Sequence, residues 1–150
     1  MPLFARKPEA KPLRLIAQAA DDLPPLAALL QDSVLRVGDM AYDKAGRHFT
    51  LRLNRFCHES GRHVPLRAPS VVRVNGATRV RMRGLDLAKT KQVLSLLDIA
   101  AEVVDAPACA LTLRFAGEAG PDIRIEAECV DVLLMDLASP RRAKTVPNHG

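Results

Sequence analysis

The clearest pattern in the chain is an alternation of apolar and polar residues over 47–56. Phe49, Leu51 and Leu53 occupy every second position, and polar side chains lie between them. A period of two places the apolar side chains on one face of a β-strand and the polar ones on the other. Shorter signals predict further strands at 34–42, 71–74 and 78–84, and a short apolar segment predicts one at 13–16. Within 34–42 the apolar positions change parity across Gly38, which predicts a β-bulge.

One helix is predicted directly after Asp21 and Asp22, whose carboxylates favour a helix N-terminus. Pro24 and Pro25 are tolerated there, because the N–H groups of a first turn have no partner within the helix. The leucines that follow recur at helical spacing. We therefore expect an amphipathic helix that ends near residue 31 and packs its leucine side on the core.

A short string is repeated in the sequence: TLRL (50–53) returns as TLRF (112–115). Laying residues 80–138 over 13–79 aligns these two strings closely and places the helix pattern on 93–98. We therefore expect two copies of a β-α-β-β-β unit, with a second helix in the second copy. Chance is the alternative explanation, since alternating patterns resemble one another easily.

The duplication predicts an α+β fold, in which the β-α-β-β-β units form a curved or barrel-like, mainly antiparallel sheet with two helices. Asn75-Gly76 is a strong hairpin signal and is expected to pair the last strand of the first unit with the first strand of the second. A pseudo-twofold axis would then pair 13–16 with 130–136, which protects both sheet edges. A plain two-layer α+β sandwich is the alternative.

Length and composition suit a single domain: the chain has 150 residues, of which 48% are hydrophobic and 26% charged. The domain is expected to consist of the pseudo-repeats 13–79 and 80–138, between flexible tails at 1–12 and 139–150, the second of them basic. No apolar run reaches the roughly 20 residues that cross a bilayer, and no signal peptide is evident. Three cysteines at no metal-like spacing suggest reduced thiols. A cytoplasmic protein without a membrane partner is therefore expected.

The formal net charge of +5 is spread unevenly. The first 85 residues are basic, whereas residues 86–138 are acidic. This separation weakens the case that a pI near 9.5 indicates nucleic-acid binding, because self-association explains such a charge dipole equally well.

The most suggestive chemical feature is a row of arginines along the predicted strand 78–84. They occupy alternate positions, so their guanidinium groups should project from one face, and two arginines of neighbouring strands can extend it. Such a cluster can hold phosphate groups through charge and forked hydrogen bonds. The candidate binding residues are Arg52, Arg73, Arg79, Arg81 and Arg83.

The aromatic content argues against single-stranded nucleic acid as the ligand of these arginines. The chain has one Tyr, four Phe and no Trp, whereas such proteins usually stack bases on aromatic side chains. The alternative is a solvated sheet face, on which the arginines pair with carboxylates such as Glu126, Glu128 and Asp131.

No catalytic or metal-binding motif stands out. His48, Cys57, His58 and His63 are the possible metal ligands, but the adjacent Cys57 and His58 would face opposite sides of a strand. A Cys57–His nucleophile pair lacks an evident orienting acid. The sequence has no glycine-rich phosphate loop and no nucleophile elbow. We therefore predict no catalytic residue, no metal and no cofactor.

Residues 13–56 resemble the opening of a family of small alphaproteobacterial proteins of unknown function (DUF2948-like). The resemblance lies in the pattern LQD-V-VGD-AY over 30–42 and F-L-LNRF over 49–56. The later strings RVRMRGLD and LTLRFAGEAGPDIRIEAECVDVLLMDL are also similar, so the likeness covers most of 13–138. It implies a bacterial cytoplasmic protein and brings no activity, cofactor or catalytic residue.

Three functions are compatible with these observations. The leading hypothesis is a non-catalytic protein-interaction module, whose partner is an unknown protein or a second copy of the chain. The alternative is nucleic-acid or anion binding through an arginine-rich sheet face. A third is an enzyme acting at a cleft between the two units.

Overall fold

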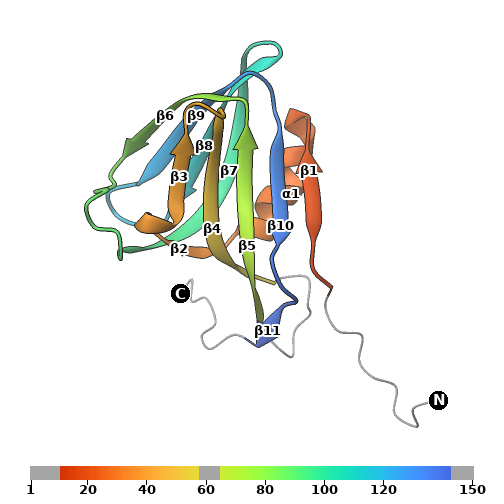
Figure 1. Cartoon of the computed structure of the whole chain (residues 1–150), viewed down its shortest axis with the longest axis vertical. Coiled ribbons are helices and arrows are strands. Elements are labelled where there is room, and N and C mark those ends of the chain that lie inside the picture. Colours follow the sequence, from red (N-terminus) through yellow and green to blue (C-terminus); the bar gives the residue numbers. More distant parts are fainter. Residues whose placement is uncertain (1–10, 58–64, 143–150) are drawn as a thin grey trace, which may run out of the picture.

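The computed structural model describes residues 11–57 and 65–142 and contains one α-helix, α1 (Leu23–Leu30), and two short 3-10 helices, η1 (Ala20–Asp22) and η2 (Val37–Asp39) (Figure 1). The strands are β1 (Arg14–Ala17), β2 (Val34–Arg36), β3 (Met40–Asp43), β4 (His48–Phe56), β5 (Leu66–Asn75), β6 (Ala77–Arg83), β7 (Val93–Asp105), β8 (Ala108–Phe115), β9 (Asp122–Ala127), β10 (Val132–Asp136) and β11 (Arg141–Arg142). They form one eleven-stranded antiparallel sheet in the order β1-β10-β5-β4-β2-β7-β8-β9-β6, with β3 beside β4 and β11 beside β5.

The sheet folds over so that its two halves face each other. We call β1, β10, β5, β4 and β3 the front half, and β7, β8, β9 and β6 the rear half; Figure 1 shows the front half nearer the viewer. β2 pairs with both β4 and β7 and so joins the halves. The inward side chains of both halves share one core, and the alternation predicted for Phe49, Leu51 and Leu53 of β4 is confirmed.

The predicted first helix is present. α1 packs against β7 and β4, with Leu23, Leu26 and Leu30 buried. Pro24 and Pro25 lie in its first turn, as predicted. Among the described residues, no helix has both the length and the apolar character that a membrane span requires.

The predicted second helix is wrong, because residues 93–98 begin the long strand β7. The fold is therefore mainly an antiparallel sheet with a single helix, and the sheet is open, with β1 and β6 at its edges. A duplicated α+β unit is not supported, since the helix of the first unit corresponds to a strand of the second. The error has two causes. Val93 and Leu97 are apolar although exposed, and a register shift between Leu96 and Asp98 interrupts the period of two.

The predicted Asn75-Gly76 hairpin is also wrong, because β5 and β6 do not pair with each other. Gly76 has a φ of +69°, and the chain turns there from the front half into the rear half. The N–H of Asn75 donates to the carbonyl of Asp131 at 2.9 Å, and that of Ala77 donates to the carbonyl of Arg47 at 2.8 Å. The backbone groups that would close a hairpin therefore bond to other segments.

The predicted pairing of 13–16 with 130–136 is confirmed. β1 runs antiparallel to β10, with Arg14 opposite Met135 and Ile16 opposite Leu133. Residues 1–10 and 143–150, most of the two predicted tails, lie outside the described residues. The described part of the C-terminal tail contains β11, which pairs with β5.

A buried ion pair links β4 to β10 in the front half. Both side chains are fully buried, and Arg55 donates from Nε and Nη2 to the two carboxylate oxygens of Asp136 at 3.0 and 2.8 Å. The carboxylate also accepts hydrogen bonds from Ser70 Oγ at 2.6 Å and from the N–H of Leu13 at 2.8 Å. Burial alone raises the pKa of Asp136, but these hydrogen bonds outweigh it and hold the pKa below its ordinary value.

The predicted bulge at Gly38 is a full break between β2 and β3. η2 fills the break, and Asp39 Oδ2 accepts a hydrogen bond from the N–H of Arg36 at 2.9 Å. The N–H of Gly38 donates to the carbonyl of Thr90 at 2.9 Å, which holds this segment towards the rear half. Beyond the Val34–Asn54 pair that joins β2 to β4, a groove lies between the β2–η2 segment and β4.

Candidate functional site

The arginines that the sequence singles out do not form one row. Arg52 of β4 and Arg73 of β5 lie on the outer side of the front half. Arg79, Arg81 and Arg83 of β6 lie on the outer side of the rear half. Because the two halves share a core between them, these outer sides point in opposite directions. The expected single arginine face is therefore two separate surfaces.

On the rear half, most outward arginines have a carboxylate partner on another strand. The pairs are Arg81–Glu126, Arg83–Asp122, Arg114–Asp98 and Arg124–Glu102. Hydrogen bonds from Arg83 and Arg114 hold the pKa values of Asp122 and Asp98 below their ordinary range. Within the described part of the chain, Arg79 is the outward arginine of β6 that forms no ion pair. This surface largely neutralises itself, as a solvated face would.

The outward side chains of the front half are different. Strand register places Arg14, Met135, Val71 and Arg52 side by side across β1, β10, β5 and β4. The next row contains Ile16, Leu133, Arg73 and Thr50. We call the eight side chains of these two rows the front face. It contains no carboxylate, and its three arginines form no ion pair with any described residue.

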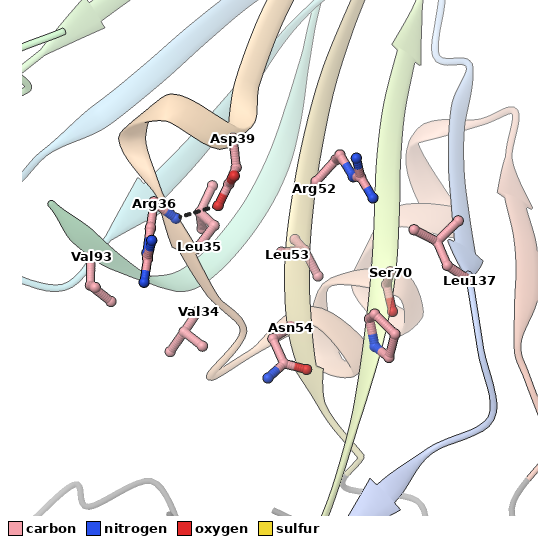
Figure 2. Close-up of a pocket in the computed structure, with 11 residues that line it drawn as sticks. Val34, Leu35, Arg36, Asp39, Arg52, Leu53, Asn54, Ser70, Val93 and Leu137 are labelled. Carbon is pink, nitrogen blue, oxygen red and sulfur yellow. Dashed lines mark hydrogen bonds between the residues drawn. The ribbon is translucent and has the colours of Figure 1, made fainter. Parts of the chain in front are cut away.

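The groove between the β2–η2 segment and β4 borders the front face and has a volume of about 500 Å³. Figure 2 shows Arg36 and Asp39 on one side of it, Arg52 and Asn54 on β4, and Leu137 beyond β5. The guanidinium group of Arg52 lies over β5, so this arginine belongs both to the groove and to the front face. The groove therefore extends the front face towards β2.

The acidic and hydroxyl groups in the groove are already engaged. Asp39 Oδ2 accepts a hydrogen bond from the N–H of Arg36, the last residue of β2. Ser70 Oγ donates to the buried Asp136. Arg36 and Arg52, by contrast, form no ion pair with any residue in the described ranges. The groove thus offers cationic groups beside apolar ones, with a single carboxylate that is partly satisfied.

The comparison with protein families follows the resemblance seen in the sequence. Residues 13–149 match the family described as "Protein of unknown function (DUF2948)". The chain belongs to the DUF2948 family. No curated protein and no solved structure is detectably similar to it. The family description names no activity.

The described residues of this DUF2948 family member include several possible metal ligands and nucleophiles. No group of three or more His, Cys, Asp or Glu side chains there could hold a metal ion. His48 lies 3.2 Å from Asp43 at the β3–β4 turn, away from the groove, and Cys57 is buried. The other candidate ligands, His58 and His63, lie outside the described residues. The residues that line the groove include one acidic side chain, Asp39.

Sequence reasoning missed two arginines of this site, Arg14 and Arg36. Arg14 begins β1 and is followed by three apolar residues, so the sequence pattern does not give its direction, and its neighbour across the sheet depends on the β1–β10 pairing. Arg36 reaches the groove because β2 ends there and η2 follows. The expected bulge would have left Arg36 within a continuous strand.

Proposed function

We propose that this protein is a non-catalytic protein-interaction module that binds its partner on the front face. The observation that carries the proposal is that Arg14, Arg52 and Arg73 form no ion pair with a described residue, whereas most outward arginines of the rear half do. The partner is a protein segment that carries both acidic and apolar side chains.

Charge supports an acidic partner. The front face carries three guanidinium groups and no carboxylate among its eight side chains. Arg73 also has an electrostatic interaction with Asp43, which lies outside the two rows. An incoming carboxylate would meet bidentate donors that no internal group occupies. Arginine is also enriched at protein interfaces, where such pairs form.

Apolar side chains between the arginines support a protein over a simple anion. Ile16 is 47% exposed, and Leu133, Met135 and Val71 are half-buried on the same face. A partner that covers them gains roughly 25 cal/mol per Å² of apolar area removed from water. A mixed surface of this kind needs a ligand with both apolar and acidic groups.

The other proposed ligands fit less well. The front face carries no aromatic side chain on which a base could stack, and Arg81 and Arg83 on the rear half are paired. A second copy is less suitable, since most of the carboxylates that its rear-half strands would offer are already paired with its own arginines. A separate protein is therefore the preferred partner.

Fluorescence anisotropy with a labelled peptide of alternating Glu and Leu residues tests the proposal. Arg14→Glu and Arg73→Glu should each weaken binding by about tenfold or more, because each turns an attraction into a repulsion. Arg79→Glu is the matched control: it makes the same charge change at an exposed arginine without an ion pair, but on the rear half.

Three results would overturn the proposal. The first is equal weakening by Arg79→Glu, which would indicate a general charge effect. The second is tight binding of single-stranded DNA that depends on Arg79, which would establish the nucleic-acid alternative. The third is binding of anionic vesicles in preference to the peptide. A Lys/Leu peptide of the same length serves as the charge-reversed ligand and should not bind.

A further inference from the structure

We propose that the groove between the β2–η2 segment and β4 binds the C-terminal residue of the partner protein. The free α-carboxylate would bind to Arg36 and Arg52, and an apolar last side chain would lie against the leucines of the groove. This inference rests on the proposed function in one respect, that the partner is a protein. It adds which part of the partner is recognised.

The groove leaves a stretch of β4 without a strand neighbour on one side. β3 pairs with β4 as far as Leu51, and β2 resumes the pairing only at Asn54. Arg52 and Leu53 therefore have no partner strand on the groove side. Backbone groups of successive residues in a strand point to alternate sides, so one of these two residues directs its N–H and C=O towards the groove. An extended chain end could use them.

The charges of the groove suit a single carboxylate. Arg36 lies on one side and Arg52 on the other, and neither guanidinium group is engaged in an ion pair with a described residue. Asp39 bonds to the N–H of Arg36 within η2, so its charge lies at the β2 side. The planar fork of a guanidinium group matches the two oxygens of a carboxylate. The Arg52–Asn54 side is therefore the more favourable position for the anion.

The apolar walls require more than an anion. Val93 is 63% exposed and Leu137 is 46% exposed, and both line the groove together with Leu53. An inorganic anion would leave these side chains in water. A ligand that carries a carboxylate beside an apolar group satisfies both features of the site, and a chain that ends in an apolar residue has this combination.

The openness of the groove favours a chain end over a free organic acid. Sites for small molecules usually bury 70–90% of the ligand, which an open groove does not achieve. A chain end is attached to further residues, and these can continue over the front face, which shares Arg52 with the groove. An internal glutamate of the partner supplies a carboxylate but no apolar side chain at the same position.

Two matched pools of short peptides test this inference. Both end in Leu with randomised preceding residues, and one has a free C-terminal carboxylate while the other has a C-terminal amide. We expect the free-acid pool to bind about tenfold tighter in fluorescence anisotropy, since a hydrogen-bonded carboxylate contributes more than a neutral amide. Arg36→Gln and Arg52→Gln should each reduce this ratio towards one. Asp39→Asn should increase it, because a like charge is removed.

The controls separate this inference from the proposed function. Arg14→Glu should weaken both pools equally, because Arg14 lies on the front face outside the groove. Equal binding of the two pools, or binding of neither pool, would overturn the chain-end proposal. If the internal Glu/Leu peptide still binds through Arg14 and Arg73, the proposed function stands without it. Binding of 4-methylpentanoate as tightly as the free-acid pool would assign the groove to a small organic acid instead. Thermal melting checks that each variant is folded.

Discussion

The outer rows of the rear and front halves use arginine in opposite ways. On the rear half, one row across four strands reads Arg83, Asp122, Arg114 and Asp98, so the charges alternate in sign from strand to strand. On the front half, the corresponding row reads Arg14, Met135, Val71 and Arg52, with charge at both ends and apolar side chains between. The number of arginines therefore says little about binding; the presence or absence of neighbouring carboxylates is what separates the two surfaces.

The front half also contains a carboxylate that could have neutralised its arginines but is used elsewhere. Asp136, at the end of β10, points inwards and pairs with the buried Arg55. Ion pairing thus stabilises the interior of the front half and the exterior of the rear half. Substituting a member of the buried Arg55–Asp136 pair and a member of the exposed Arg114–Asp98 pair compares what each pair contributes to the free energy of unfolding.

The largest effect is expected from Asp136→Asn. The substitution leaves the guanidinium group of Arg55 buried without its counter-ion, which typically costs about 3–5 kcal/mol of the free energy of unfolding. Urea unfolding followed by circular dichroism measures the change. Arg55→Met combined with Asp136→Leu should recover part of the loss, because no uncompensated charge then remains. A loss below about 1 kcal/mol, the size expected for an exposed pair, would show that the pair is not isolated from water.

A smaller effect is expected from acidification. The pKa of Asp136 lies below its ordinary value of about 3.9, so its contribution to stability is complete above that value and is lost as the pH falls through the lower pKa of the folded state. Urea midpoints measured between about pH 5 and pH 2 should fall for the natural protein. In Asp136→Asn the urea midpoint should fall less steeply with falling pH. If the midpoint falls as steeply as in the natural protein, other carboxylates account for the acid sensitivity.

Adding salt to the same pH experiment distinguishes the acid sensitivity of the rear half from that of the front half. The pKa values of Asp98 and Asp122 are also lowered by their arginines, whose side chains are largely exposed, although the Asp122 carboxylate is mostly buried. At about 1 M salt, where charges are screened over roughly 3 Å, the rear-half share of the acid sensitivity should shrink. The part of the acid sensitivity that comes from the buried Asp136 should remain.

A still smaller effect is expected from Arg114→Met on the rear half. Arg114 and Asp98 form an exposed pair, and such pairs contribute about 0.2–1 kcal/mol. Measuring Arg114→Met and Asp136→Asn in the same urea assay compares the loss of an exposed ion pair with the loss of a buried one. A loss of stability as large as that from Asp136→Asn would contradict the interpretation of the outer side of the rear half as a solvated surface.

The smallest effect on stability is expected from Arg52→Gln. No ion pair is lost and a repulsive charge is removed, so the free energy of unfolding should stay within about 0.5 kcal/mol. Differential scanning calorimetry is sensitive enough to detect such a change. A loss above about 1 kcal/mol would assign Arg52 a structural role and weaken the binding proposal.

β4 was predictable from the sequence because its alternation is regular and one side of it faces the core. β1 was predictable only as a short apolar segment, and its Leu15 and Ile16 are exposed. The pattern over 93–98 predicts a helix because Val93 and Leu97 add apolar positions on the outer side, where the groove and solvent lie. The Asn75-Gly76 pair was recognised as a turn, but its direction depends on hydrogen bonds to Asp131 and Arg47, which are distant in sequence.

The candidate site was predictable only in part for a similar reason. Arg52 and Arg73 could be identified as outward residues of strands from alternation alone. Their separation from Arg79, Arg81 and Arg83 depends on the corner at Gly76, which local patterns did not reveal. Whether an outward arginine finds a carboxylate is decided by strand order, since every rear-half partner lies on a different strand.

The pairing of β1 with β10 has a consequence for synthesis on the ribosome. β1 is translated long before β10, yet among the described strands β10 is its one neighbour, and the hydrogen bond from Leu13 to Asp136 spans 123 positions in sequence. Contacts between such distant segments slow folding. The apolar residues of β1 must therefore stay unpaired through most of translation, and a nascent chain paused before residue 132 would present Leu15 and Ile16 to chaperones.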